Sequence, residues 1–240
     1  MTPLVADLLR RRARSRGADP LITYYDLSTD ERTELSATSF LNWVDKTSNL
    51  LVDELLLDAG AVIDLQLART NPGHWMTLVL AAAAWQVGAV ARVSAAGPSD
   101  LLVLGPDWES HDRSGAEAVL ACSLHPLGLG FPAALPPDLM DFSLEVRGQS
   151  DHHSPAGRSP ADLAWVDAER ELSQVELVGD VRERGSLRRL VQVVEPWPSV
   201  RDGLLVPVVT GGSAVLVRGD DPQRLDRIIV SERIDANRAP

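Results

Sequence analysis

The stretch AVIDLQLARTNPGHWMTLVLAAAAWQVGAVARVSA, residues 61–95, sets the fold class. Its first part, AVIDLQLA, is a short apolar run of the kind found in buried parallel strands. The part HWMTLVLAAAAWQVG is almost wholly apolar over about four turns, which predicts a helix buried on every side. AVARVSA, at its end, and DLLVLGP, at 100–106, predict two more strands. Strands and helices alternating at this spacing form βαβ units, so we expect an α/β fold with a mostly parallel sheet flanked by helices.

Two elements are predicted before this stretch. The β-rich runs at 21–25 and 32–35 enclose the polar sequence DLSTDE, which predicts an N-terminal β-hairpin. A helix follows, capped by Ser36 or Thr38 and ended by Gly60. Its predicted core face consists of Phe40, Leu41, Trp43, Val44, Leu50, Leu51 and Leu55.

The middle of the chain has little periodicity. LHPLGLGFPAALPPDLMD, at 124–141, is rich in proline and predicts a loop-rich crossing without a long helix. The segment 148–162, GQSDHHSPAGRSPAD, is polar and rich in Pro, Gly and Ser, which predicts a flexible segment. We find no internal repeat and expect one domain over 1–240, with this flexible segment inside it.

The C-terminal part predicts a short helix after Ser199, a strand at 214–217 and a helix at 222–230. Asp220 or Asp221 is placed to cap the last helix, and Pro222 suits its first turn.

Composition limits the function. The 240 residues carry a formal charge of −11, which argues against general nucleic-acid binding. No apolar run reaches the roughly 18 residues of a membrane span, and no signal peptide is evident. A single cysteine excludes an internal disulfide and agrees with a cytoplasmic location. The basic cluster at 10–16 allows a polyanion-binding arm, but we favour a helix with leucines on one face and solvated arginines on the rest.

Two segments resemble the AMP-forming adenylating enzymes, the superfamily of acyl-CoA synthetases, peptide-synthetase adenylation domains and luciferases. They are TNPGHWMTLVLAAAAWQVGAVARVSA at 70–95 and LLVPVVTGGSAVLVRGDDPQRLDRIIVSERID at 204–235. The resemblance implies the fold of roughly the first half of that family's large N-terminal domain. It also implies that Gly211 and Gly212 form a tight turn between a helix and a strand and bind no nucleotide.

The resemblance places a phosphate-binding loop, rich in Gly, Ser and Thr and ending in lysine, directly after DLAWV at 162–166. Here the next residues are DAERE, at 167–171, with three carboxylates and neither glycine nor lysine. Such a segment repels a triphosphate. Lys46, the only lysine, is on an early predicted helix, and the family's later motifs are not in this sequence. We therefore expect no ATP-dependent adenylation or ligase activity and no cofactor.

Two clusters contain side chains able to bind metal or transfer protons. They are Asp151, His152 and His153 in the segment 148–162, and Asp107, Glu109, His111 and Asp112 after the strand at 100–106. Histidines in a flexible segment usually face solvent, and acids at a strand end usually cap helices or lie in solvated turns. We therefore predict no metal site and no catalytic residue in either cluster.

Other candidates are aromatic or nucleophilic. Cys122 with His125 resembles a nucleophile and base, but Cys122 is in an apolar run, and a buried cysteine is the commoner state. Four tryptophans are predicted to be core residues: Trp43, Trp75, Trp85 and Trp165. In VEPWPSVRDG, at 194–203, Trp197 replaces an aromatic or histidine that the resembled family directs toward its acyl-adenylate. Trp197 and Ser199 are therefore the predicted ligand-binding residues.

Three functions are open on this evidence. We favour a non-catalytic protein that acts through contacts with an unknown protein partner. The alternatives are a small-molecule or acyl-group binding module with a remnant pocket near Trp197, and an enzyme of unrecognised chemistry. Part of a larger fold leaves apolar surface uncovered unless that surface has become polar, so we also expect a homodimer. The amphipathic C-terminal segment, in particular, needs a partner element in the chain or outside it.

Overall fold

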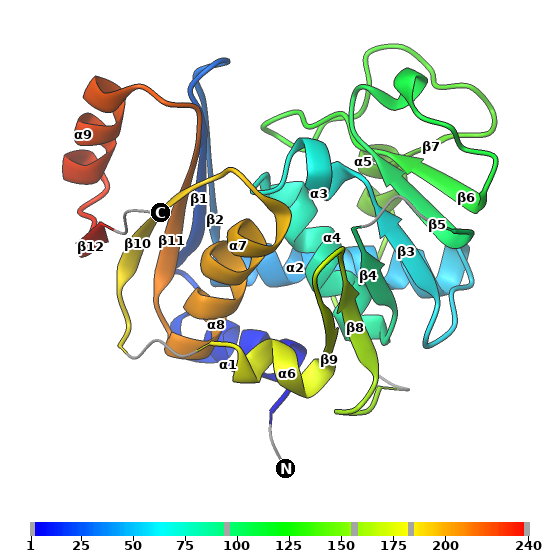
Figure 1. Ribbon diagram of the computed structural model, residues 1–240, viewed down its shortest axis with the longest axis horizontal. Helices are drawn as coiled ribbons and strands as arrows, with labels where there is room; N and C mark the ends of the chain where they lie inside the picture. The colour runs from blue at the N-terminus through cyan, green and yellow to red at the C-terminus, as the bar shows by residue number, and fades with distance from the viewer. Residues whose placement is uncertain (1–2, 94–96, 155–157, 182–184, 238–240) are drawn as a thin grey trace.

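The computed structural model describes residues 3–93, 97–154, 158–181 and 185–237. Two sheets lie side by side, and α2 and α4 lie between them (Figure 1). The five-stranded sheet has the order β12-β10-β11-β1-β2 and consists of β1 (Pro20–Asp26), β2 (Glu31–Ser36), β10 (Arg188–Gln192), β11 (Ser213–Arg218) and β12 (Ala236–Asn237). The seven-stranded sheet has the order β7-β6-β5-β3-β4-β8-β9 and consists of β3 (Val62–Leu65), β4 (Val90–Arg92), β5 (Ser99–Leu104), β6 (Ala116–Ala121), β7 (Met140–Asp141), β8 (Leu163–Val166) and β9 (Glu171–Ser173).

Strand pairing is parallel except at two places, where β1 pairs with β2 and β8 with β9. The α/β fold with mostly parallel pairing and an N-terminal hairpin is therefore confirmed, with the predicted strands divided between two sheets. The helices are α1 (Val5–Arg16), α2 (Ala37–Asn49), α3 (Leu67–Thr70), α4 (Trp75–Val87), α5 (Phe142–Arg147), α6 (Gln174–Gly179), α7 (Pro196–Val200), α8 (Val206–Thr210) and α9 (Pro222–Ser231). None of the helices within the described ranges has both the length and the apolarity needed to cross a bilayer.

The central helix α4 behaves as its composition predicts. Every residue from Trp75 to Val87 is buried, because the helix packs against α1, α2, β3 and β4. The Nδ1 atom of His74 accepts a hydrogen bond from the Met76 amide and caps the helix, and Gly88 ends it with a φ of 79°. Ser36 caps α2 and Asp221 caps α9, as predicted.

Two predicted helix boundaries are wrong. The helix that begins after Ser36 does not extend to Gly60: α2 continues into a π-helical turn, Leu50–Glu54, and the chain then leaves the helix where Leu56 takes a φ of 53°. The helix predicted after Ser199 begins earlier, at Pro196, because proline is favoured in a first turn. It runs through a second π-helical turn, Arg201–Leu205, into α8.

The glycine pair at the end of α8 forms the predicted turn. Gly211 ends the helix with a φ of 78°, a conformation that favours glycine. A Cβ at Gly212 would lie 2.3 Å from the carbonyl oxygen of Leu187, so only glycine fits beside the start of β10. The turn connects α8 to β11, which pairs in parallel with both β1 and β10.

Candidate functional site

The turn between β8 and β9 occupies the place where the resemblance puts a phosphate-binding loop. It is short: the Asp167 amide donates to the Arg170 carbonyl at 3.0 Å. The Asp167 carboxylate accepts hydrogen bonds from Trp165 Nε1, the Glu169 amide and Arg170 Nη1, each at 2.8 Å. The turn therefore directs its own donors onto its own carboxylate.

These contacts favour the ionised form of the Asp167 carboxyl group. Burial raises the pKa of Asp167, but the hydrogen bonds from Trp165, the Glu169 amide and Arg170 outweigh burial and hold this pKa below its ordinary value. Arg170 also donates to Glu169 at 2.7 Å, so one guanidinium serves two carboxylates. Glu171 follows, exposed. The turn carries net negative charge at neutral pH.

The two predicted ligand residues lie on α7, beside this turn. The Trp197 ring is buried, 5.1 Å from the Trp165 ring, with the Arg170 guanidinium 6.0 Å from its centroid. Ser199 is buried too, and its Oγ atom has no hydrogen-bond partner among the described residues. Ligand binding at Trp197 and Ser199 stays a prediction.

The histidine cluster in 148–162 is divided among separate partners. Asn49 Nδ2 donates to the carbonyls of Ser150 and His152, so Asn49 Oδ1 is left to accept the proton of His153 Nδ1 at 2.7 Å. Asp151 instead pairs with Lys46 at 2.9 Å. No group of three potential metal ligands gathers within the described part of the chain. The predicted flexibility of 148–162 stays a prediction, and residues 155–157 lie outside the described ranges.

The remaining candidates are held by local contacts in the described structure. Cys122 is buried, which raises the pKa of its thiol. His125 Nδ1 accepts a hydrogen bond from the Leu127 amide instead of meeting that thiol. In the strand-end cluster, His111 Nε2 lies 3.3 Å from Asp107 Oδ2, and Asp112 accepts from the Ser114 amide. Glu109 is exposed. These acids lie in a surface turn after β5.

The four predicted core tryptophans are in the core. Trp75, Trp85 and Trp165 are buried, and Trp43 is partly buried, with its ring 5.0 Å from that of Trp75.

The basic cluster of α1 differs from the prediction of solvated arginines. Arg12 is only 5 % exposed, and it donates to the carbonyls of Arg16 and Pro20. Arg10 binds the buried Asp45 carboxylate through both terminal nitrogens, at 2.9 and 3.2 Å. The prediction is wrong for these two side chains because their guanidinium groups bind acceptors within the chain, the buried Asp45 carboxylate and two backbone carbonyls.

Arginines meet the C-terminal ends of three helices near the starts of β1, β10 and β11. Arg12 donates to the last carbonyl of α1, Arg16 to Gly211 after α8, and Arg188 to Glu232 after α9. Cations suit this end of a helix, where unpaired carbonyls carry partial negative charge. These residues line a hollow of about 420 Å³.

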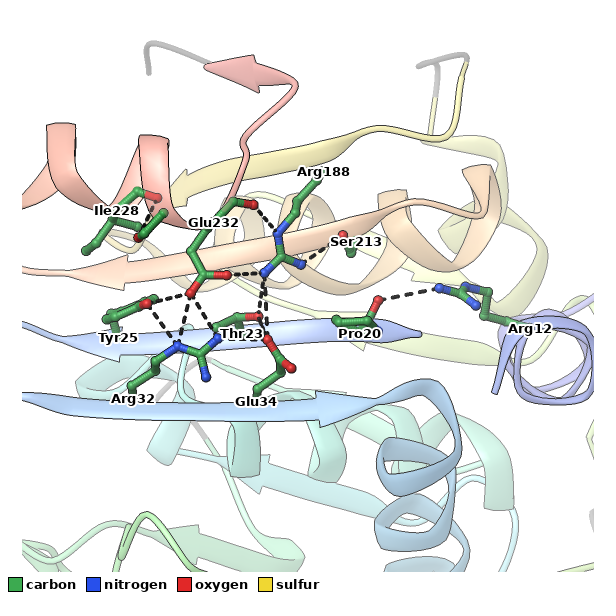
Figure 2. Close-up of polar contacts among 11 residues, drawn as sticks. Arg12, Pro20, Thr23, Tyr25, Arg32, Glu34, Arg188, Ser213, Ile228 and Glu232 are labelled. Atoms are coloured by element: carbon green, nitrogen blue, oxygen red, sulfur yellow. Dashed lines mark hydrogen bonds and ion pairs between the residues drawn. The ribbon is translucent and has the colours of Figure 1, made fainter. Parts of the chain in front are cut away.

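Glu232 is the centre of a polar network that the sequence did not predict. Its carboxylate accepts from Tyr25 Oη at 2.5 Å, Arg188 Nη2 at 2.5 Å and Arg32 Nε at 3.0 Å (Figure 2). Arg188 also donates to Thr23 and Ser213. Through Tyr25, Arg32 and Arg188, the network links the end of α9 to β1, β2 and β10. The apolar face of the C-terminal segment is covered within the chain, since its residues pack against the five-stranded sheet: Leu225, Ile228, Ile229 and Ile234.

Solved structures share this fold. The chain is similar to an acyl-CoA synthetase of Brucella canis, with a TM-score of 0.75, 16% identity and coverage of 98% of this chain and 47% of that one. It is similar to the N-terminal domain of FACL13 from Mycobacterium tuberculosis, with a TM-score of 0.66, 15% identity and coverage of 99% and 63%. It is also similar to the anthranilate CoA ligase AuaEII in complex with anthranoyl-AMP, with a TM-score of 0.72, 12% identity and coverage of 96% and 48%. The chain thus spans about half to two thirds of these chains and has the fold of their N-terminal part.

The sequence matches no family model. It is 31% identical over 243 residues to a TIGR03089 family protein of Mycobacterium tuberculosis (strain ATCC 25618 / H37Rv), and the alignment covers 97% of each chain. With the fold of an acyl-CoA synthetase N-terminal domain, the chain belongs to the TIGR03089 family.

Proposed function

We propose that this chain is a non-catalytic protein with an acyl-CoA synthetase fold, which acts through protein contacts. The observation that carries the proposal is the turn at 167–170. A loop that binds phosphates offers backbone N–H groups and positive charge to its ligand. In this turn the Glu169 amide and the Arg170 guanidinium are both taken by the Asp167 carboxylate.

Electrostatics strengthens the proposal. A triphosphate beside the turn would approach Asp167, Glu169 and Glu171, with a single arginine to offset them. Lys46 is on α2, where it forms an ion pair with Asp151 and donates to the Gln149 carbonyl at 2.5 Å. Within the described ranges, therefore, no lysine supports a phosphate at this turn.

We expect no pyrophosphate exchange into ATP with any carboxylic acid, and no calorimetric binding of ATP at micromolar concentration. An acyl-CoA synthetase assayed in parallel provides the positive control. ATP binding with a micromolar Kd would overturn the non-catalytic assignment. The Glu169 amide and the Arg170 guanidinium, which could bind phosphate at this turn, already donate to the Asp167 carboxylate.

One observation favours the second function, a binding module for a small molecule or acyl group. Ser199 Oγ is buried without a partner in the described structure, next to Trp197, and a buried unpaired hydroxyl costs about 1 to 3 kcal/mol. The same assay series separates the two functions if AMP, CoA and acyl-CoAs are added. A rise in the unfolding midpoint with acyl-CoA that Trp197→Ala abolishes would favour the binding module.

A further inference from the structure

Three leucines are exposed together on one surface. Leu127 is 76 % exposed, Leu129 41 % and Leu144 59 %. Leu127 and Leu129 flank Gly128 in the loop after β6, and Leu144 is on α5. The loop meets the helix here, since a Cβ at Gly130 would lie 3.1 Å from Leu144 Cγ. We call Leu127, Leu129 and Leu144 the leucine patch.

The loop that carries the patch is held in place by its backbone. Gly128 has a φ of 64° and lies against the Trp43 ring, where a Cβ would come within 2.8 Å of that ring. Its carbonyl accepts from Arg147 at 3.1 Å, and the Leu129 carbonyl accepts from Ser123 Oγ at 2.5 Å. Leu127 and Leu129 therefore face solvent because a tethered loop directs them there, beside Leu144 on α5.

An apolar patch of this extent is often functional. Three leucines exposed to these fractions present on the order of 300 Å² of apolar surface. A stable interface takes about 800 Å² from each partner, with an apolar centre and a polar rim. The patch supplies the centre of such an interface, and the polar residues around it must supply the rim.

The rim carries both signs of charge. Lys46 and Asp151, an ion pair at 2.9 Å, share a hollow of about 330 Å³ with Leu127, Trp43 and Arg147. Glu145 is exposed next to Leu144. Two positive and two negative side chains thus lie beside Leu127 or Leu144, in a chain whose formal charge is −11.

We propose that the leucine patch is the interface between two copies of this chain. A two-fold axis sets the same surface against itself, so a rim with both signs can place each charge opposite its counterpart. A cationic partner would instead be attracted to the more negative surfaces of the chain. This inference deepens the proposed function, on which it rests for the role of protein contacts, by naming the surface and the partner.

Light scattering after gel filtration, at about 50 μM, tests the interface. We expect a mass of twice the 26.0 kDa chain for the wild type and of one chain for the Leu127→Asp, Leu144→Asp double variant. Val230→Asp is the matched control, because Val230 is 78 % exposed on α9, which lies on the opposite side of the molecule from α5 in Figure 1, and should leave the dimer intact. A wild-type monomer, or a double variant that stays dimeric, would overturn the proposal.

A second measurement does not depend on how the double variant folds. The native thiol, Cys122, is buried, so Leu127→Cys introduces the reactive site for a short bifunctional maleimide. We expect covalent dimers from Leu127→Cys and none from Val230→Cys; equal yields from both would contradict the interface. The outcome is separable from the nucleotide assay, since ATP binding leaves the mass unchanged and a monomer leaves the nucleotide result unchanged.

Discussion

Replacing Asp45 by asparagine should lower the free energy of unfolding by about 3 kcal/mol, because it removes one partner of a buried ion pair. The Asp45 carboxylate is only 2 % exposed and accepts from Arg10 and, at 2.7 Å, from Gln86 Nε2. Asparagine keeps the shape of the side chain but not its charge. Its amide nitrogen would also face donors, and the Arg10 guanidinium would stay in a site with little access to water.

The effect should extend beyond α1 and α2. Arg10 also donates to the Gln86 side chain of α4 and, at 2.7 Å, to the His153 carbonyl. Asp45 therefore orients a guanidinium that joins two central helices to the segment 148–162. Hydrogen exchange of the backbone amides of residues 149–153 should become faster in Asp45→Asn. The carbonyls of this segment accept hydrogen bonds from Lys46 and Asn49, which are on the same helix as Asp45.

Denaturant unfolding at neutral pH measures the loss, with Asp30→Asn as the matched control. Asp30 also pairs with an arginine, Arg224, at 2.6 Å, but it is 84 % exposed. Exposed pairs contribute about 0 to 1 kcal/mol, so this control should change little. If Asp45→Asn and Asp30→Asn were equally stable, the buried network would not contribute as its geometry indicates.

The elements that the sequence predicted best are those whose environment is set by local pattern. The apolar run 75–87 can only be a buried helix, and Ser36 and Asp221 cap helices through side chains two or three residues from the amides they bind. The π-helical turn after α2 has no such signal. Leu50 and Leu51 keep the apolar periodicity, while the helix itself ends at the positive φ of Leu56.

The polar contacts were missed because their partners are far apart in sequence. Arg10 is 35 residues from Asp45 and 143 from His153, and an arginine on an amphipathic helix is expected in solvent unless a buried acid is known to face it. The same holds for Arg188 and Glu232, 44 residues apart. By contrast, DAERE at 167–171 was informative, since its lack of glycine and lysine is visible in the sequence itself.

Replacing Glu232 by glutamine should lower the free energy of unfolding by about 2 kcal/mol at pH 7, because hydrogen bonds to charged groups are among the stronger ones. The carboxylate is 9 % exposed and forms ion pairs with Arg188 at 2.5 Å and Arg32 at 2.9 Å. Glutamine retains one acceptor oxygen for Tyr25 but leaves the two guanidinium groups without their shared counter-charge. Among the described residues, the other carboxylate that pairs with these arginines is Glu34, 2.9 Å from Arg32 and 3.8 Å from Arg188.

The pH dependence distinguishes a lost charge from a simple packing defect. Burial raises the pKa of Glu232, but hydrogen bonds from Tyr25, Arg188 and Arg32 outweigh it, so the pKa in the folded chain is below the ordinary value. A carboxyl group with a lowered folded pKa stabilises the fold fully above its unfolded pKa, about 4.3, and this stabilisation is lost as pH falls through the folded pKa. The difference between wild type and Glu232→Gln should therefore shrink between pH 7 and pH 3. Glu169→Gln, at an exposed carboxylate that shares its arginine, should show little difference at either pH. A Glu232→Gln defect of equal size at both pH values would mean that shape, and not charge, fastens the end of α9 to the sheet.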